Sequence, residues 1–490
     1  MKKLFGTDGI RGVANKYPMT PLMAMKTGIA LAFFIKQKKN SFASIVIGKD
    51  TRVSGDMLEA ALAAGISSMG VNVLSAGVIP TPAVAFLASR IKDAGAGIVI
   101  SASHNPYYDN GIKIFNSKGY KLKDDEEKII EDLILNNNFN GHSSGFLKFN
   151  ENNKPDNSGN GDGDKKNCNG ESSYKNIHGT GSDFNIGRIS SFSYADEKYA
   201  EFLKNLFKSE KTGSFRKLKL VIDCSNGAAS KIAPLIFTGD LFDSQFIFNS
   251  PDGRNINENC GSQHTETLGK LVLKHSADLG LAFDGDADRL IALDENAEEI
   301  TGDRILAICA NHAKKMGRLK NNVVVSTVMS NIGLSKTLES LGIDHVTTDV
   351  GDREVLHKME ETGAVMGGED SGHMIFSDCH TTGDGILTAL KLIIVMLDTG
   401  EKLSKLASIM KVYPQILMNV EVDPSKPDFM KIKEIADEIC AVENELEKTG
   451  RVLVRYSGTQ PLLRVMVEGP EKTLIEQYCK RICSIIKTKI

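Results

Sequence analysis

The sequence predicts an α/β protein of about three or four domains that ends in a smaller α+β domain. First, its 490 residues are too many for a single hydrophobic core. Second, short apolar stretches typical of strands alternate with amphipathic stretches typical of helices over most of the chain. Third, in three regions an apolar strand leads into a loop of Gly, Ser and Asn that opens a helix, which indicates one α/β unit used three times.

The first of these regions begins with a predicted helix, "TPLMAMKTGIALAFFIKQ". Thr20 is its expected N-cap, and Pro21 takes the first helical position, where a missing N–H costs nothing. Strands and helices then alternate through "ASIVIG" ending at Gly48, "SGDMLEAALAAGISSMG" from Ser54, "VNVL", "PTPAVAFLASR" and "AGIVIS". This alternation predicts a sheet covered by helices.

A polar segment interrupts the alternation. Residues 151–170 hold eleven Asn, Gly or Ser and no Val, Ile, Leu, Met or Phe. Such a stretch cannot bury enough apolar surface to offset the entropy lost on ordering. We therefore predict a disordered or loosely ordered insertion, and we favour a tolerated surface insertion over a partner-binding arm.

The alternation resumes at "LKLVIDCSNGAASKIAPLIF" from Leu218 and recurs at "NVVVSTVMSNIGLSKTLESLG" from Asn322. "GILTALKLIIVMLDTG" from Gly385 is predicted to be a buried core helix, because it is too short to span a bilayer. "MNVEVD", a charged helix from about Lys426, "RVLVRYS", "LLRVMVEG" and a final helix predict the closing α+β domain. The expected divisions of the chain are 1–137, 138–183 (the insertion), 184–302, 303–415 and 416–490.

Charge and cysteine usage limit the classes of function. The net charge is −3, from 59 Lys and Arg and 62 Asp and Glu, which argues against binding to nucleic acid or to membrane surfaces. The eight cysteines form neither a CxxC pair nor a zinc spacing, as is typical of a reducing compartment. The first residues lack the apolar core of a signal peptide, so we expect a cytoplasmic protein.

Asp284, Asp286 and Asp288 form the strongest chemical signal. Three carboxylates this close repel one another without a cation, and oxygen-only ligands favour Mg²⁺ or Ca²⁺. An EF-hand loop is one alternative, because Glu295 falls at its twelfth position. However, Arg289 stands where that loop needs glycine, and the flanks resemble strands. An acidic turn without metal is the other alternative, although apolar strands on both sides favour a fixed loop.

A polar cluster follows the apolar strand that ends at Ile100. Ser103 and His104 stand at its tip, and Lys113 comes soon after. A serine hydroxyl is a poor nucleophile unless a base, a metal or a positive field assists it, so a strand-end cap is the simpler interpretation. No GxSxG elbow surrounds Ser103, which weakens the hypothesis of a Ser-His-Asp hydrolase.

Two further clusters predict what the serine acts on. "RYSGTQ" from Arg455, with Arg464 nearby, offers guanidinium groups, hydroxyls and backbone amides, the set that a phosphate dianion needs. "GEDSGH" from Gly368 offers carboxylates and a hydroxyl between glycines, which suit sugar hydroxyls. Either stretch alone is also compatible with an ordinary turn.

Together these motifs resemble those of the α-D-phosphohexomutase superfamily. The matching stretches follow that family's order and span nearly the whole chain outside the insertion: "FGTDGIRG" (5–12), "GKDTRVSG" (48–55), "ISASHNPYYDNGIK" (100–113), "FDGDADR" (283–289), "VGDREV" (350–355), "GGEDSGH" (367–373), "TTGDG" (381–385) and "RYSGTQPLLRVMVEG" (455–469). The resemblance implies three related α/β domains with mixed sheets, plus a smaller α+β C-terminal domain, around a central cleft.

The resemblance also implies roles for individual residues. Ser103 would carry the phosphoryl group and, with Asp284, Asp286 and Asp288, would bind Mg²⁺. The other implied catalytic residues are Thr7, Arg11, His104, Lys113 and Arg289, with Lys113 also a candidate general acid/base. The implied substrate-binding residues are Arg353, Glu369, Ser371 and His373 for the sugar, and Arg455, Ser457, Gly458, Thr459 and Arg464 for the phosphate that does not react.

The reaction implied is that of an isomerase. Phosphoserine would phosphorylate a hexose monophosphate, the bisphosphorylated sugar would turn over, and Ser103 would take back the other phosphate. The resemblance favours glucosamine 6-phosphate and glucosamine 1-phosphate as the substrate pair. Alternatives are glucose or mannose phosphates, a phosphatase, or a non-catalytic descendant that binds sugar phosphates. The predicted partners are small sugar phosphates, and a homodimer is compatible with the sequence. Nucleic acid and membranes are not predicted as partners.

Overall fold

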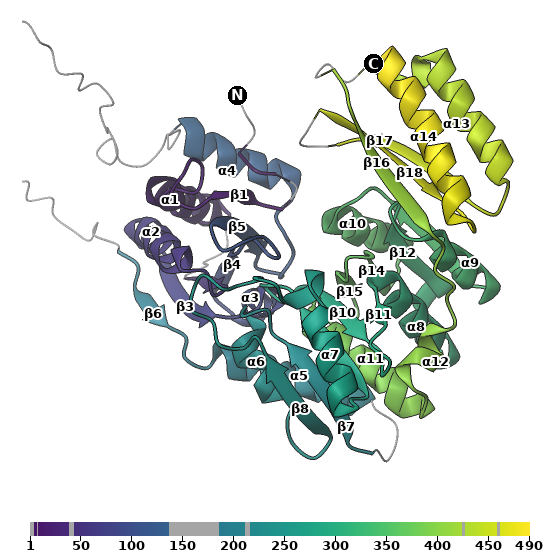
Figure 1. Cartoon of the computed structure of the whole chain (residues 1–490). Helices are drawn as coiled ribbons and strands as arrows, with labels where there is room; N and C mark the ends of the chain where they lie inside the picture. Colours follow the sequence, from purple (N-terminus) through teal and green to yellow (C-terminus); the bar gives the residue numbers. More distant parts are fainter. Residues whose placement is uncertain are drawn as a thin grey trace, which may run out of the picture.

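The computed structural model describes residues 4–6, 8–38, 44–136, 186–210, 216–423, 427–457 and 461–490. The predicted insertion at 138–183 lies outside these residues, as do the predicted site residues Thr7, Gly458 and Thr459. The described residues form three mixed sheets with helices packed against them and one antiparallel sheet near the C-terminus (Figure 1). The predicted fold class is therefore confirmed.

The first sheet has six strands in the order β1-β5-β4-β2-β3-β6. The strands are β1 Ile10–Val13, β2 Ser44–Lys49, β3 Asn72–Val78, β4 Ala94–Ile100, β5 Asp109–Asn116 and β6 Ile189–Ser191. The helices of this unit are α1 Pro21–Gln37, α2 Ser54–Ser68, α3 Thr81–Arg90 and α4 Asp124–Asn136. Thr20 caps α1 as predicted, because its side chain accepts a hydrogen bond from the backbone N–H of Met23.

The second sheet has the order β11-β10-β9-β7-β8, and the third has the order β13-β12-β14-β15. The elements of the second unit are α5 Ala195–Glu210, β7 Leu218–Asp223, α6 Ala229–Ile236, β8 Phe242–Ile247, α7 Glu266–His275, β9 Leu279–Phe283, β10 Leu290–Leu293 and β11 Glu299–Ile300. Those of the third are α8 Gly302–Lys315, β12 Val323–Thr327, α9 Ile332–Ser340, β13 Asp344–Thr348, α10 Asp352–Thr362, β14 Met366–Gly368, β15 Met374–Phe376, α11 Gly385–Thr399 and α12 Leu403–Ala407.

One arrangement of four strands recurs in all three sheets. The central strands β2, β7 and β12 each pair in parallel with two neighbours. One neighbour of each (β4, β9 and β14) then pairs antiparallel with the strand that follows it (β5, β10 and β15). The unit expected three times is therefore present, and the three loops between these antiparallel pairs, 101–108, 284–289 and 369–373, are topologically equivalent.

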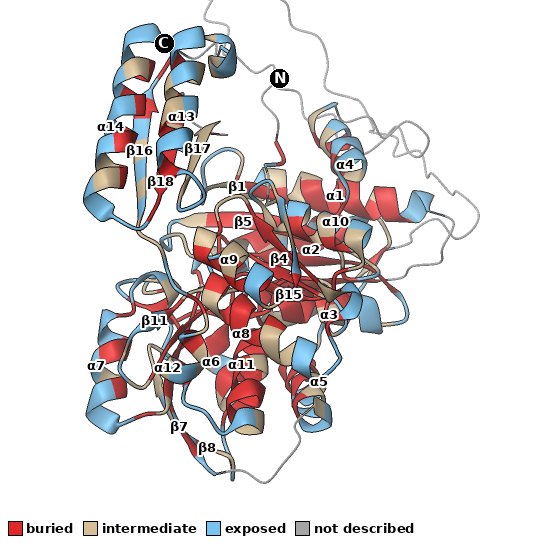
Figure 2. Cartoon of the chain, turned by 90° about the vertical axis from the view of Figure 1, so that its right-hand side faces the viewer, coloured by how far each residue is buried: buried red, intermediate tan, exposed pale blue. Residues whose placement is uncertain are grey.

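Buried apolar residues join these units into one body. A continuous cluster runs from α3 and β4 through the second sheet to α11, and Figure 2 shows buried residues filling this region. α11 is buried along most of its length, as predicted, and the Asp384 side chain caps it by accepting from the N–H of Leu387. Among the described helices, the length and hydropathy needed to cross a bilayer do not occur together.

The C-terminal unit is an antiparallel sheet, β16-β18-β17, with two helices packed on it. Its elements are β16 Gln415–Glu421, α13 Lys433–Leu446, β17 Arg451–Tyr456, β18 Leu462–Glu468 and α14 Lys472–Lys489. The prediction of a helix from about Lys426 is wrong, because α13 begins only at Lys433. Asp428 accepts a hydrogen bond from the N–H of Met430 and starts a separate 3-10 turn, Phe429–Lys431, before the helix.

Candidate active site

The equivalent loops of the first and second units meet at Ser103. Its Oγ donates a hydrogen bond to Asp284 Oδ2 at 2.5 Å, and both residues are buried. Gly285 allows this approach, because a Cβ there would lie 2.5 Å from the Ser103 carbonyl oxygen. The third loop joins the second through the N–H of Leu290, which donates to the Gly372 carbonyl at 3.1 Å.

Ser103 adopts a left-handed backbone conformation with φ 53°, which is unfavourable for a residue with a Cβ. Three hydrogen bonds hold it there. Its N–H donates to Ser101 Oγ at 2.9 Å, and its carbonyl accepts from Arg52 Nη2 at 2.9 Å and from Asn257 Nδ2 at 2.8 Å. These hydrogen bonds hold the serine against the 284–289 loop, which is called the acidic loop below.

Arg52 is a residue of this support to which the sequence assigned no role. Its buried guanidinium donates five hydrogen bonds: one to Asp50 and four to carbonyls of the 101–109 segment. Its only signal was its place inside the stretch "GKDTRVSG". Motif spacing cannot predict this role, because the partners of Arg52 are backbone carbonyls of a loop and not particular side chains.

Asp284, Asp286 and Asp288 offer carboxylate oxygens that all lie within 4.8 Å of one another. Asp286 Oδ2 accepts from Thr81 Oγ1 at 2.6 Å, but Asp286 Oδ1 and Asp288 Oδ1 are buried without a hydrogen-bond partner. Burial and the two neighbouring carboxylates raise the pKa of Asp284 well above its usual value. An all-oxygen donor set with unsatisfied oxygens is what a hard divalent cation needs, so these residues fit a metal ion.

Lys113 supplies positive charge to this loop. Its Nζ lies 2.9 Å from Asp286 Oδ2 and 3.5 Å from Asp288 Oδ2, and its side chain is buried. Burial lowers the pKa of Lys113, but Asp286, Asp8 and Asp288 outweigh this effect and raise it well above the usual value. In this arrangement Lys113 is held protonated, which favours charge stabilisation over proton abstraction.

Two arginines predicted for the site also lie near the acidic loop. Arg289 Nε is 3.8 Å from Asp288 Oδ1. Burial alone would lower the pKa of Arg289, but Asp288 and Asp284 outweigh this effect and raise it. Arg11 forms an ion pair with Asp8, and Asp286 and Asp288 also act on it. Both side chains are partly exposed, and each has a buried Nε without a hydrogen-bond partner, so both have capacity for an incoming anion.

The two histidines have different surroundings. His104 Nδ1 lies 3.3 Å from Ser103 Oγ, and burial and Arg289 lower the pKa of His104 to about 4, so the ring is neutral at pH 7. Carboxylates lie beside His373: Nδ1 is 3.6 Å from Asp288 Oδ2. Burial alone would lower the pKa of His373, but Asp288 outweighs this effect and raises it. The resemblance implied that His373 binds sugar, and in the structure it lies buried against the acidic loop.

The other predicted sugar-binding residues lie in two settings. Glu369 is half-buried and accepts from the N–H of Gly351 at 3.2 Å, whereas Ser371 is exposed at the tip of the third loop. Arg353 forms ion pairs with Glu127 and with Asp124 of α4, the latter at 3.2 Å. In this structure the guanidinium of Arg353 therefore joins the third unit to the first.

Three of the predicted phosphate residues are described, and they belong to the C-terminal unit: Arg455, Ser457 and Arg464. Arg455 and Arg464 stand directly opposite each other on β17 and β18. Burial and the Arg464 guanidinium lower the pKa of Arg455, and Arg464 Nε is buried without a hydrogen-bond partner. Two like charges side by side are unfavourable until an anion joins them. Ser457 is buried beside this pair.

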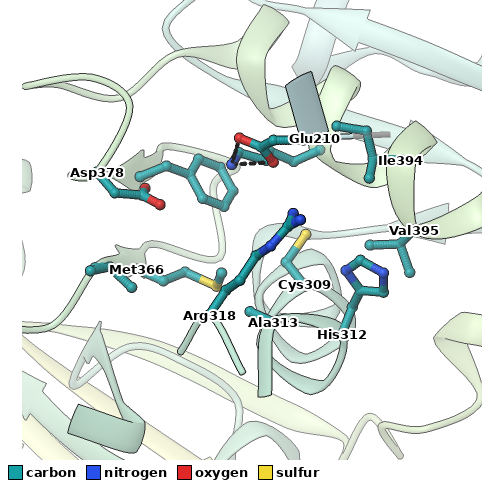
Figure 3. Close-up of a pocket in the computed structure, with 12 residues that line it drawn as sticks. Glu210, Cys309, His312, Ala313, Arg318, Met366, Asp378, Ile394 and Val395 are labelled. Atoms are coloured by element: carbon teal, nitrogen blue, oxygen red, sulfur yellow. Dashed lines mark hydrogen bonds and ion pairs between the residues drawn. The ribbon is translucent and has the colours of Figure 1, made fainter. Parts of the chain in front are cut away.

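A separate cavity of about 270 Å³ lies between α8, α11 and the β14–β15 hairpin (Figure 3). An ion pair between Lys391 Nζ and Glu210 Oε1, at 2.7 Å, crosses it, and Figure 3 shows the Arg318 side chain extending into it. None of the predicted site residues that the structure describes lines this cavity. The site around Ser103 is therefore distinct from it.

Comparison with known proteins agrees with this architecture. Four models of phosphoglucomutase/phosphomannomutase domains match the chain: α/β/α domain I at 2–141, domain II at 197–298, domain III at 301–413 and the C-terminal domain at 417–485. Over 99% of both chains, the protein is 60% identical to the phosphoglucosamine mutase of Desulforapulum autotrophicum. It is 49% identical to that of Syntrophus aciditrophicus over the full length of both.

Solved structures share the fold at lower identity. A phosphoglucomutase/phosphomannomutase family protein from Burkholderia thailandensis has a TM-score of 0.77 at 22% identity, over 100% of this chain and 98% of that one. N-acetylphosphoglucosamine mutase from Aspergillus fumigatus, solved with GlcNAc-6P and magnesium, has a TM-score of 0.64 at 17% identity, over 99% and 95% of the two chains. The protein belongs to the phosphoglucomutase/phosphomannomutase family.

Proposed function

We propose that this protein is a mutase that interconverts glucosamine 6-phosphate and glucosamine 1-phosphate through a phosphoserine at position 103. One observation carries the proposal: Ser103 Oγ lies 2.5 Å from a buried aspartate of the acidic loop, beside the cation Lys113. A phosphoryl group on that oxygen would meet a preorganised field of charges. Such positioning and electrostatics account for most of the catalysis of phosphoryl transfer.

In the first half of the reaction, the bond between phosphorus and Ser103 Oγ breaks. A new bond forms between phosphorus and the free hydroxyl oxygen of the sugar monophosphate, and the proton of that hydroxyl passes to a base. The products are a bisphosphorylated sugar and the free hydroxyl of Ser103, whose oxygen gains a proton as the phosphoryl group leaves. Lys113, Arg289 and Arg11 are the cations whose surroundings support a role in stabilising the moving phosphoryl group.

In the second half, the sugar turns so that its other phosphate faces Ser103. Ser103 Oγ takes that phosphoryl group, and the sugar oxygen it leaves gains a proton. Arg455, Ser457 and Arg464, with Gly458 and Thr459, would hold the phosphate that does not react in either orientation. The facing charges of Arg455 and Arg464 support this assignment, because a phosphate dianion relieves their repulsion.

The metal ion is proposed to be Mg²⁺, held by Asp284, Asp286 and Asp288 together with an oxygen on Ser103. It would supply positive charge to offset these carboxylates and the phosphoryl group. Two observations support this choice: the ligands are all hard oxygens, and Asp286 Oδ1 and Asp288 Oδ1 are buried without a hydrogen-bond partner. Glu369 and Ser371, at the third loop, are proposed to bind sugar hydroxyls, with Arg353 and His373 nearby.

The choice of amino sugar is supported by relatives that share nearly half or more of this sequence and are named phosphoglucosamine mutases. We also propose the division of the chain at 137/138, 183/184, 302/303 and 415/416. The homodimer and the cytoplasmic location stay predictions.

The test uses the purified full-length protein and a coupled assay on glucosamine 1-phosphate, with mass spectrometry of the 97–115 peptide. We expect phosphate on Ser103, and a loss of turnover of about 10³-fold or more in Ser103→Ala with substrate binding kept. The exposed serine variant Ser89→Ala is the matched control. Faster turnover of glucose or mannose phosphates would contradict the sugar assignment, and release of inorganic phosphate would indicate a phosphatase.

A further inference from the structure

A closed ring of alternating acidic and basic side chains includes Asp288 of the acidic loop. Its members, in order, are Asp288, Lys113, Asp8, Lys121, Asp352 and His373. Asp8 joins the two lysines, because its Oδ2 lies 3.2 Å from Lys113 Nζ and its Oδ1 lies 2.5 Å from Lys121 Nζ. Each carboxylate of the ring therefore stands between two basic side chains of the ring, and Asp8 also pairs with Arg11 outside it.

The ring closes through the third unit. Lys121 Nζ also forms an ion pair with Asp352 Oδ2, and the same oxygen lies 3.6 Å from His373 Nε2. His373 Nδ1 then lies 3.6 Å from Asp288 Oδ2, and Lys113 Nζ lies 3.5 Å from that oxygen. The two ring nitrogens of His373 thus face different carboxylates.

The members of the ring come from three parts of the chain that match separate family domains. Asp8, Lys113 and Lys121 belong to the first, Asp288 to the second, and Asp352 and His373 to the third. Asp352 is the first residue of α10, and Lys121 lies just after β5. The ring therefore crosses both boundaries at the point where the three units meet.

The ring is shielded from solvent. Side-chain exposure ranges from 2% for Lys113 to 24% for Asp8, with Lys121 at 11% and Asp352 at 17%. Charges in such surroundings persist only when each has a partner of opposite sign. Although burial lowers the pKa of Lys121, Asp352 and Asp8 outweigh it and raise the pKa, so Lys121 stays charged.

Lys113 and His373 are the two basic members that contact the acidic loop, and each has partners on two sides. On one side, both residues contact the acidic loop. On the other side, His373 contacts Asp352 directly, and Lys113 contacts Asp8, which in turn pairs with Lys121. Lys113 has a long flexible stem, so a shift of Asp8 after the loss of Lys121 lets its ammonium group move. A displacement of about 1 Å at a reacting group can cost about 10²-fold in rate.

We propose that Lys121 and Asp352 are positioning residues for phosphoryl transfer, which keep Lys113 and His373 against the acidic loop across the contact of the first and third units. This inference rests on the proposed function. Lys121 and Asp352 act through their neighbours.

The test compares Lys121→Met and Asp352→Asn with the wild-type full-length enzyme in steady-state kinetics. We expect kcat to fall about 10- to 100-fold, with KM for glucosamine 1-phosphate changed less than about threefold, because a transition-state contact is lost and not a substrate contact. Lys121→Arg restores the positive charge and should recover most of kcat. The double variant should be no more than about threefold worse than the less active single variant, because both break the same ring.

Lys118→Met is the matched control. Lys118 is exposed in the turn that precedes Lys121, and it lies outside the ring. The control should keep wild-type kcat, and thermal melting of every variant reports the folded fraction.

The outcomes separate two failures. If the wild-type protein turns over no hexose phosphate, the proposed function is wrong and the role of the ring goes with it. If the wild type is active but Lys121→Met and Asp352→Asn keep its kcat, the ring proposal alone is wrong. A kcat that falls only in step with the folded fraction also overturns it, because the ring then stabilises the fold without positioning Lys113 and His373.

Discussion

The acidic loop of the second unit and the β17–β18 hairpin of the C-terminal unit each hold charges of one sign, but in different surroundings. The hairpin, which carries Arg455 and Arg464, is called the basic hairpin below. Asp284, Asp286 and Asp288 are buried, and protein cations already lie beside them. Arg455 and Arg464 are half-buried on neighbouring strands, opposite each other. Like charges that are buried need compensation within the fold, whereas half-exposed ones can wait for a ligand in water.

Under the proposed function, this difference would separate chemistry from binding. The buried loop would present a fixed field to a phosphoryl group on Ser103, so changes there should act on kcat. The half-exposed hairpin would meet a phosphate that arrives and leaves with the substrate, so changes there should act on KM. The following predictions test that separation, from the largest expected effect to the smallest.

Asp284→Asn should lower kcat by about 10³-fold or more, because it removes a ligand charge from the residue that accepts the hydrogen bond of Ser103. Without metal, the same variant should melt at a higher temperature than the wild type at pH 8. The raised pKa of Asp284 means that its contribution to stability is present below the unfolded value of about 3.9 and is lost as the pH rises. Melting curves at pH 5 and pH 8, with and without Mg²⁺, check this. If the metal-free variant is less stable than the wild type at pH 8, the neighbouring carboxylates do not destabilise the charged form of Asp284.

Gly285→Ala should lower kcat by about 10²-fold with a smaller change in KM. The added Cβ would lie 2.5 Å from the carbonyl oxygen of Ser103, so the two loops must move apart. Gly239→Ala is a stringent control, because a Cβ there meets no atom within 4 Å, while its φ of 106° strains the backbone of an alanine. Equal kinetics in both variants would show that the close approach of the loops is unimportant.

Arg455→Gln should raise KM for the sugar phosphate by about 10- to 100-fold and change kcat less. Removing one of two facing guanidinium groups from a half-exposed site should change the free energy of unfolding by less than about 1 kcal/mol. Steady-state kinetics and chemical denaturation measure the two effects, with the exposed Lys433→Gln as control. A fall in kcat at unchanged KM would place this hairpin with the chemistry and break the comparison.

Asp384→Asn should change the pH dependence of stability with little effect on kinetics. Burial raises the pKa of Asp384 to about 6, so its favourable contribution is full below the unfolded value of about 3.9 and is lost as the pH rises through about 6. Asparagine can still accept from the N–H of Leu387 and can donate to the hydroxyl of Tyr199. Relative to wild type, the variant should gain roughly 2–3 kcal/mol between pH 4 and pH 7. Parallel stability curves would contradict the raised pKa.

Local patterns were enough to predict most elements of the fold. The cap of α1 by Thr20, the buried helix α11 and the strand-loop-helix unit follow from residues close together in the chain. The acidic loop could also be predicted as a candidate cation site, because three aspartates at alternate positions between apolar strands have few structural uses. The start of α13 was not predicted correctly, because a 3-10 turn capped by Asp428 precedes the helix and hydrophobic periodicity does not reveal such a turn.

The sequence by itself determined which loops have the residues for the proposed chemistry, since each motif is contiguous and its residue types limit what it can bind. Only the tertiary structure decided that these loops meet. Strand pairing repeated in three units brings the 101–108, 284–289 and 369–373 loops to equivalent positions, and Arg52, Lys121 and Asp352 then gain partners far away in the chain. Burial makes those pairings obligatory, because a charge removed from water must find its counter-charge wherever the fold places one.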